Sequence, residues 1–386
     1  MKQKTIYLDN AATTFPKPLS VCRAAYECMK DYCGNPGRAS HPIALKAAEK
    51  IYECREKLAD MFGAEYENVC FTFNTTYALN TAIKGVVSEG DHILLSNMEH
   101  NSVLRPVHEL KQQKKCTYDI FDVYGECGLT VEEIIKNIDS KAQDKTKVLI
   151  CTHMSNICSY TLPIEQIGKY CKEHGIIFIV DAAQSAGHIP IDIKDMNIDI
   201  LCMPSHKGLY GPQGCGIMIL GEDINLPRTL VEGGNGIASL DLSMGNQAPE
   251  RFEAGTLCTP AIAGLCEGVD FIEKNTVEYI DGYEKKLWER AYSDLCDIPE
   301  IKIYAPEYAG PILSFNIEGY NSDEVGNILS GYGICVRTGF HCSMLGHSTL
   351  KTDNGIYGGC IRASFGMANT LRDVDLLCRR VKEIIP

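Results

Sequence analysis

The stretch IIFIVDAAQ, residues 176–184, contains an apolar run that ends on Asp181. A short run of this kind, rich in β-branched residues, predicts a buried strand. A second run, at 198–203, ends in Pro-Ser-His and then Lys207. Each of these two expected strands therefore delivers a chemically competent side chain just beyond its end.

The same pattern continues on both sides of these runs. Four further apolar runs predict strands, at 69–73, 92–96, 147–152 and 216–220. Amphipathic helical patterns lie between several of them, at 103–114, 130–137 and 163–174. Strands that alternate with helices indicate βαβ units, so the fold class is α/β with a mostly parallel sheet. A further amphipathic pattern at 370–385 predicts a C-terminal packing helix.

Polar residues follow five of the expected strands. In open α/β sheets, ligands bind just beyond the carboxyl ends of the strands. The residues found there are Thr75 and Thr76, His100, Asn156, Asp181 with Gln184, and Ser205 to Lys207. Any one of these groups alone is typical of a helix cap or a turn. Five together indicate a functional site at one edge of the sheet.

Length and charge exclude several classes of protein. A chain of 386 residues is long enough for one large and one small domain. The net charge of −13, without a Lys/Arg block, argues against a nucleic-acid surface. No run is long and apolar enough for a signal peptide or a membrane span, so we expect a cytoplasmic protein that binds no membrane.

Cysteine is unusually frequent, with 19 in the chain. The cysteines are scattered through apolar stretches, and no C-x-x-C pair occurs. This distribution predicts buried thiols kept reduced in a cytosol, and we expect no metal site. A single cysteine is therefore structural unless its surroundings indicate otherwise.

Lys207 and Asp181 together indicate one cofactor. Pyridoxal phosphate (PLP) needs an amine for a Schiff base and an anionic partner for its pyridine nitrogen. Its phosphate needs hydroxyls and backbone N–H groups at a helix N-terminus, which Thr75 and Thr76 can supply. His100 could lie against the ring. The alternatives are that Asp181, Thr75 and Thr76 only cap helices, and that His206 is a buried core histidine.

Several motifs resemble one known family. They are YLDNAATTFPKP (7–18), DAAQSAGHIPID (181–192), SHKGLYGPQGCG (205–216), RFEAGT (251–256), VRTGFHCS (336–343) and IRASFGMANT (361–370). In this order they resemble the cysteine desulfurase and selenocysteine lyase group of class V aminotransferase-like enzymes, over nearly the whole chain. The resemblance implies PLP fold type I (aspartate aminotransferase-like) with a large, mostly parallel seven-stranded sheet. It also implies a PLP-binding α/β domain at 17–257, a small α+β domain from 1–16 and 258–386, and a homodimer.

The resemblance also implies roles for individual residues. Lys207 is the Schiff-base lysine and a proton carrier, and Asp181 is the partner of the pyridine nitrogen. The remaining cofactor contacts are Gln184, His100, Thr75, Thr76, Ser205, His206 and, from a second subunit, Thr256. The substrate-binding residues are Asn156 and Arg362, which hold the substrate carboxylate, together with Asn10 and Ala12.

Cys342 has surroundings that differ from those of the other cysteines. Gly339 and Gly346 bracket it, which predicts a mobile loop. Two histidines (His341 and His347) and Arg337 lie nearby in sequence, and positive charge would favour a nucleophilic thiolate. We therefore expect Cys342 to accept sulfur from the substrate as a persulfide. Cys158, two residues after Asn156, is the other thiol expected near the site.

The expected activity is PLP-dependent desulfuration of L-cysteine to L-alanine, with an amino-acid substrate and a sulfur-acceptor protein as partners. Three alternatives stay open. The first is a selenocysteine lyase, which can release selenide without the nucleophilic cysteine. The second is another class V activity such as transamination. The third is a non-catalytic sulfur carrier that has kept the fold.

Overall fold

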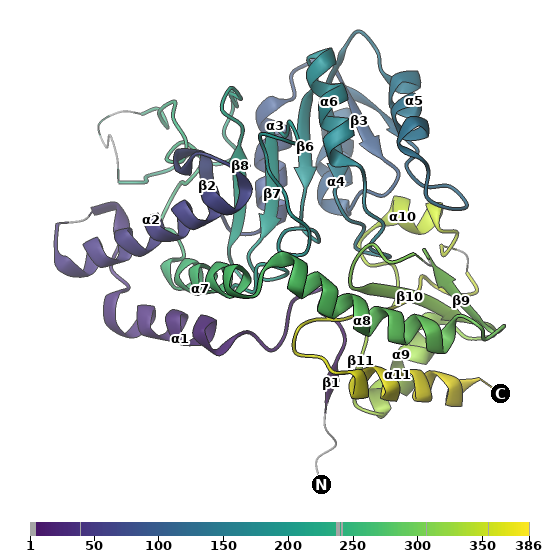
Figure 1. Ribbon diagram of the computed structural model, residues 1–386. Helices are drawn as coiled ribbons and strands as arrows, with labels where there is room; N and C mark the ends of the chain where they lie inside the picture. The colour runs from purple at the N-terminus through teal and green to yellow at the C-terminus, as the bar shows by residue number, and fades with distance from the viewer. Residues whose placement is uncertain are drawn as a thin grey trace.

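A computed structural model describes residues 5–38, 40–236, 240, 242–305, 307–353 and 355–385. Figure 1 shows a large sheet with helices on both faces and a smaller helix-and-sheet unit beside it. The helices are α1 (Leu19–Glu27), α2 (Pro42–Phe62), α3 (Thr75–Val86), α4 (Asn101–Gln112), α5 (Val131–Lys141), α6 (Ile164–His174), α7 (Thr259–Asn275), α8 (Val277–Leu295), α9 (Ser322–Gly331), α10 (Met344–Thr349) and α11 (Leu371–Ile384).

The large sheet has seven strands in the order β2-β8-β7-β6-β5-β3-β4. They are β2 (Val69–Thr72), β3 (Asp91–Ser96), β4 (Cys116–Phe121), β5 (Thr146–Thr152), β6 (Ile177–Asp181), β7 (Ile200–Pro204) and β8 (Gly216–Leu220). Strand β8 is antiparallel to both neighbours, and the other pairs are parallel. The carboxyl ends of β2, β3, β5, β6 and β7 therefore meet at one edge. The predicted α/β fold with a mostly parallel seven-stranded sheet is confirmed.

Two apolar layers bury this sheet. One layer packs α3 and α4 against one face through residues such as Leu79 and Val107. The other packs α2, α5, α6 and α7 against the opposite face through residues such as Leu58, Ile167 and Leu265. In Figure 1, α3 and α4 lie behind the strands and α6 lies in front. Burial on both faces explains why the central strands are continuous apolar runs.

The smaller unit contains two short sheets. Strands β9 (Ile301–Tyr304), β10 (Ile312–Ile317) and β12 (Ile361–Ser364) form an antiparallel sheet in the order β12-β10-β9, and β1 (Ile6–Tyr7) pairs with β11 (Ile334–Cys335) in parallel. A third apolar cluster joins these strands to α8, α9 and α11. The domain boundary at 257 stays a prediction, and the packing of α7 on the large sheet favours a boundary further along the chain.

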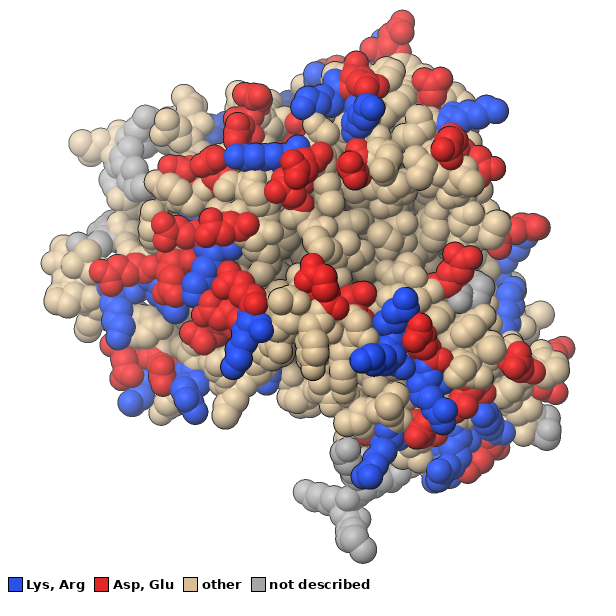
Figure 2. Space-filling view, viewed as in Figure 1, with Lys and Arg blue, Asp and Glu red and all other residues tan. Residues whose placement is uncertain are grey.

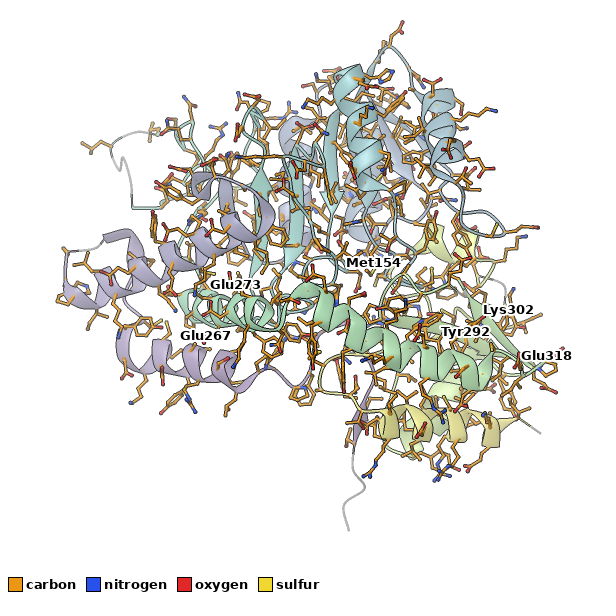
Figure 3. The ribbon with its side chains drawn as sticks, in the orientation of Figure 1. Met154, Glu267, Glu273, Tyr292, Lys302 and Glu318 are labelled. Carbon is orange, nitrogen blue, oxygen red and sulfur yellow. The ribbon has the colours of Figure 1, made fainter. Side chains whose placement is uncertain are left out.

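The segment after β5 joins the two units. The Ser159 Oγ accepts a hydrogen bond of 3.1 Å from the Ile312 N–H. The Ile157 carbonyl accepts one from the Ser314 hydroxyl. Met154 is labelled in Figure 3 near the start of α8, and a Cβ at Gly310 would come within 2.8 Å of its Cε. The residues between β5 and α6 are therefore held against the small unit.

The surface carries charges of both signs. On the face shown in Figure 2, Lys and Arg side chains are interspersed with Asp and Glu. Among the described residues, no helix combines the length and apolar character needed to cross a membrane.

Candidate active site

Lys207 and Asp181 lie at the ends of adjacent strands. Asp181 is the last residue of β6 and pairs in register with Cys202 of β7, and Lys207 follows the end of β7. Loss of solvation raises the pKa of Asp181 to about 6, although the Ala183 N–H and Lys207 oppose this rise. Desolvation, followed by the positive charge of Arg362, lowers the pKa of Lys207 to about 8. A lysine amine near neutrality is a usable base and nucleophile.

His100 is the N-cap residue of α4 and lies at the same edge of the sheet. Its Nδ1 accepts a hydrogen bond from the Ser102 N–H at 3.1 Å and lies 2.9 Å from the Ser102 Oγ. That hydroxyl lies 2.8 Å from the Thr76 Oγ1 at the start of α3. Desolvation, and then the positive charge of Lys207, lowers the pKa of His100 to about 4. A neutral imidazole is therefore joined to a hydroxyl pair at two helix N-termini.

The first turn of α3 supplies further polar groups. The Asn74 side chain caps the helix by accepting from the Tyr77 N–H at 2.9 Å. Thr75 is the first helical residue and is buried. Thr75 and Thr76 therefore lie where an α-helix presents free N–H groups and the positive end of its dipole. Their capping role and an anion-binding role are compatible, because Asn74 makes the cap.

The N-terminal segment passes over the Lys207 turn. The His206 carbonyl accepts from the Thr14 N–H at 3.1 Å and from Lys17 Nζ at 2.6 Å. His206 Nδ1 is buried and makes no hydrogen bond within the described part of the chain, and desolvation lowers its pKa to about 4. The buried Ser205 hydroxyl donates to the Pro212 carbonyl. His206 thus has unused hydrogen-bonding capacity, whereas the Ser205 proton is already engaged.

Other predicted residues are held by the N-terminal segment. Gln184 Nε2 donates to the Ala11 carbonyl at 3.0 Å. Asn10 Nδ2 donates to the Ser364 carbonyl at 2.9 Å, and the Ala12 N–H donates to the Asp9 carbonyl at 3.1 Å. The amide of Asn10 therefore joins the segment to β12.

Arg362, on β12, is buried among polar partners. Its Nη2 lies 2.9 Å from Asp9 Oδ1, and its Nη1 donates to the Asn156 carbonyl at 2.8 Å. The Nε makes no hydrogen bond among the described residues. The Asn156 side chain donates to the His341 carbonyl at 2.7 Å. The structure thus brings Arg362 and Asn156 together, with a carboxylate already on the guanidinium.

Cys342 is exposed and lies beside the His100 turn. Its carbonyl accepts from the Asn101 N–H at 2.8 Å, and its φ is +56°. The Ser343 hydroxyl donates to the Glu99 carbonyl at 3.1 Å. These bonds anchor the segment to the large sheet. The predicted mobility of this loop stays a prediction, and these hydrogen bonds tie the segment to the turn around His100.

The charge predicted for His341 and His347, and the loop position predicted for Gly346, differ from what the structure shows. Burial lowers the pKa of His347 to about 4 and that of His341 well below its ordinary value. Both rings are therefore neutral at pH 7, and the prediction that they add positive charge near the thiol is wrong. Gly346 lies inside α10, so it does not border a loop.

The remaining two candidates have contrasting environments. Cys158 is buried, its Sγ lies 3.7 Å from the Ser155 Oγ, and burial raises its pKa. Thr256 is exposed and lines a pocket with Phe73 and Tyr77. Thr256 is therefore accessible to a second molecule, and Cys158 is inaccessible to solvent.

Comparison with known proteins agrees with this geometry. Residues 6–377 match the family model described as Aminotransferase class-V. The chain belongs to the class-V aminotransferase family. The family resemblance drawn from the sequence motifs is therefore confirmed.

Named class-V relatives match over nearly their full lengths. A protein from Pyrococcus abyssi named "Probable cysteine desulfurase" is 33% identical, covering 100% of this chain and 95% of the relative. One with the same name from Methanothermobacter thermautotrophicus is 32% identical, covering 98% and 94%. A solved apo cysteine desulfurase from Thermococcus onnurineus is 31% identical with a TM-score of 0.90, covering 99% and 94%.

Sequence reasoning missed three residues of this class-V site. Asp9 was overlooked although it lies inside the motif YLDNAATT. Ser102 gave no signal beyond its place two residues after His100. Glu99 precedes His100, and its carboxylate accepts from the Thr152 N–H at 2.8 Å.

Proposed function

We propose that this chain is a PLP-dependent cysteine desulfurase that converts L-cysteine to L-alanine and holds the sulfur as a persulfide on Cys342. One observation carries the proposal. The Lys207–Asp181 pair lies at the same sheet edge as His100, and the exposed Cys342 is joined to the residue after His100 by a hydrogen bond of 2.8 Å. The named class-V relatives support the same activity.

The residues at this edge fit PLP. His206 Nδ1 is a buried polar atom without a partner, and Thr75 and Thr76 open a helix, which suits a phosphate. Asp181 is anionic and fully enclosed, which suits a protonated pyridine nitrogen. The residues that would hold the cofactor are Lys207, Asp181, Gln184, His100, Thr75, Thr76, Ser205 and His206. When bound, PLP acts as an electron sink for a carbanion at the substrate Cα.

The protein's own groups then have separate tasks. Lys207, with its pKa near 8, takes the proton from the substrate Cα and later returns one. Arg362, oriented by the Asn156 carbonyl, binds the substrate carboxylate by sharing its guanidinium with Asp9 or displacing it. Asn10 and Ala12 are proposed to contact the substrate from the N-terminal segment, which the Asn10 side chain joins to the strand of Arg362. His100, neutral at pH 7, can accept a proton from the substrate thiol.

Cys342 is the nucleophile that accepts the substrate sulfur. Its thiolate attacks the substrate sulfur, so that a sulfur–sulfur bond forms while the bond from sulfur to the substrate Cβ breaks. The electron pair of the broken bond stays on the alanine fragment, which is then protonated. Because Cys342 is exposed, a second thiol can reach the resulting persulfide.

Three finer proposals accompany the activity. We propose a homodimer in which the exposed Thr256 contacts the cofactor of the other subunit. A sulfur-acceptor protein is expected, since the exposed thiol can be approached from solvent. A cytoplasmic location is supported by the cysteines, all of which are free thiols.

The proposed function is tested with purified protein reconstituted with PLP. L-Cysteine is supplied with a thiol reductant, and sulfide and alanine are measured together. Equal amounts of the two products are expected. Sulfide release without alanine, or formation of a keto acid from L-cysteine, would contradict the proposal. Selenocysteine assayed in parallel distinguishes the lyase alternative, which predicts turnover of selenocysteine alone.

A further inference from the structure

A compact group of possible ligands lies beside Cys342 and takes no part in the proposed reaction. It consists of His341, His347 on α10, and Cys360 just before β12. All three side chains are buried, and one ligand atom from each lies within 4.8 Å of the others. Three side chains from residues 341–360 thus converge where solvent is excluded.

The distances match those around a tetrahedral metal ion. His341 Nδ1 lies 3.2 Å from His347 Nε2, and Cys360 Sγ lies 3.8 Å from His341 Nδ1. Metal–nitrogen bonds of about 2.0–2.1 Å and metal–sulfur bonds of about 2.3 Å, at tetrahedral angles, separate two nitrogens by about 3.3 Å and nitrogen from sulfur by about 3.6 Å. These two distances are within a few tenths of an ångström of the tetrahedral values, and the third pair, His347 with Cys360, lies within 4.8 Å and must close further when an ion binds.

The hydrogen bonds of His347 prepare one ring nitrogen for a metal. The Thr352 hydroxyl donates to the His347 carbonyl at 3.2 Å, so its oxygen accepts from His347 Nδ1–H at 2.6 Å. The proton is thus on Nδ1, and the unprotonated Nε2 lies 3.2 Å from His341 Nδ1. A ligand histidine held by a second hydrogen bond at its other nitrogen is the usual arrangement at metal sites.

The second histidine retains hydrogen-bonding capacity. His341 Nε2 is buried and makes no hydrogen bond among the described residues. The rings of His341 and His347 are stacked, with centroids 5.3 Å apart and planes 16° from parallel. Because His347 Nε2 is the acceptor at 3.2 Å, the ring proton of His341 lies on Nδ1 in the metal-free protein. Nδ1 becomes a ligand when that proton moves to Nε2, which has no other partner among the described residues.

Burial, and not the nearby charges, disfavours a free thiolate at Cys360. Burial raises the pKa of Cys360 to about 12, so its thiol stays protonated in the absence of a metal. Binding of a dication releases that proton, because the ligand is the thiolate. Arg337 and Arg362 oppose a cation here, whereas the Asp353 carboxylate favours one.

We propose that His341, His347 and Cys360 bind one divalent ion of the zinc class. Two imidazoles and a thiolate select a borderline-soft ion over magnesium or calcium. Three protein ligands leave one position for water or an external thiolate. Because His341 directly precedes Cys342, the ion fixes the segment that carries the exposed thiol. The proposal is independent of the cofactor chemistry.

Cobalt titration tests the site directly. Full-length protein is treated with a chelator and titrated with Co²⁺, whose visible bands and thiolate charge-transfer band report tetrahedral sulfur ligation. One Co²⁺ per chain is expected, and Zn²⁺ should displace it. Thr352→Val should weaken affinity by about 10–100-fold, because it removes the hydrogen bond that orients His347.

Variants locate the ion. Cys360→Ser should lose the thiolate charge-transfer band, and His347→Gln should no longer bind one Co²⁺ per chain. The folding of both variants is checked by circular dichroism before metal is added. Cys342→Ser and Cys266→Ser are matched controls. Cys342 is the neighbouring exposed thiol, and Cys266 belongs to a second group of possible metal ligands, together with Glu53 and Asp270. Both controls should keep the band.

Three results would overturn the proposal. They are a wild-type protein without a stoichiometric band, a band that persists in both ligand variants, and a band lost in Cys342→Ser alone. If the ligand variants do not fold, the wild-type titration and Thr352→Val still decide, since an unchanged affinity in Thr352→Val also contradicts the site. If His341 and His347 only hydrogen-bond to each other, the wild-type protein should bind no Co²⁺ at this site.

Discussion

The Arg362 guanidinium lies 2.9 Å from the Asp9 carboxylate, which comes from the opposite end of the chain. Arg362 is almost fully buried, and Asp9 is the only carboxylate that the described residues place within ion-pair distance of it. The residue proposed to bind the substrate carboxylate is therefore already paired in the substrate-free protein. Substrate must share the guanidinium with Asp9 or displace it.

Asp9→Asn tests this pair. Removing the charge leaves Arg362 buried without its counter-ion, so the variant should lose about 2 kcal/mol of stability. The same unpaired guanidinium should bind L-alanine several-fold more tightly. Thermal unfolding and calorimetric titration measure the two effects. Asp375→Asn, which breaks an exposed pair with Arg290 at 2.8 Å, should change stability much less, because solvent screens that pair. Equal effects in both variants would contradict the argument.

Lys207→Ala should abolish alanine formation and the visible absorbance of bound cofactor. Lys17 provides the matched control, because it is also largely enclosed and desolvation lowers its pKa to about 8. Lys17→Ala should keep the absorbance, since its amine already contacts the His206 carbonyl. Absorbance lost in Lys17→Ala and kept in Lys207→Ala would show that the lysine assignment is reversed.

Asp181→Asn should retain cofactor but lose activity by at least about a hundredfold, the scale of one strong electrostatic or acid–base contribution. The reason is that a neutral amide no longer favours a protonated pyridine ring. Steady-state kinetics at constant cofactor occupancy measure this loss. Asp199→Asn alters another carboxylate, which accepts from the Phe178 N–H at 2.7 Å, and should leave the rate within a few-fold. If Asp181→Asn keeps an activity near that of wild type, a group other than Asp181 controls the protonation of the pyridine ring.

Cys342→Ala should still bind cysteine yet release no alanine, because no thiolate is available to take the sulfur. Mass spectrometry of cysteine-treated wild type should find the added sulfur on the peptide containing Cys342. Cys158→Ala is the matched control and should stay active, since Cys158 is buried and its pKa is raised. A sulfur adduct on Cys158, with Cys342→Ala fully active, would reverse this assignment.

Glu99→Gln should change how stability depends on pH. Burial raises the pKa of Glu99 to about 8, so the folded protein holds a proton that the unfolded chain loses near its ordinary value. This contribution to stability is complete below about pH 4 and is lost as pH rises toward 8, at up to about 1.4 kcal/mol per pH unit. The variant should therefore show a flatter profile in urea unfolding between pH 5 and 8. Glu109→Gln, at an exposed site, should give the same pH profile of stability as wild type. A Glu99→Gln profile that runs parallel to that of wild type would contradict the raised pKa of Glu99.

The sequence predicted the central strands and the edge of the sheet well, because burial on both faces produces uninterrupted apolar runs such as that of β6. It missed β4, an edge strand in which polar residues interrupt the apolar pattern. The partner of Arg362 was also missed, since pairing between Asp9 and Arg362 depends on the tertiary fold. The charge of His341 and His347 was misjudged because sequence proximity to a thiol does not reveal burial.

The pairing of β1 with β11 has a consequence for synthesis on the ribosome. Ile6 aligns with Ile334, so the first strand to emerge waits for a partner about 330 residues later. During that interval Ile6 and Leu8, both buried in the finished protein, have no β11 to cover them. The large sheet can form as its strands emerge, whereas the small unit must await the last part of the chain. Nascent chains halted before residue 334 should therefore expose Ile6 and Leu8 to chaperones and proteases, and completion of β11 should protect both residues.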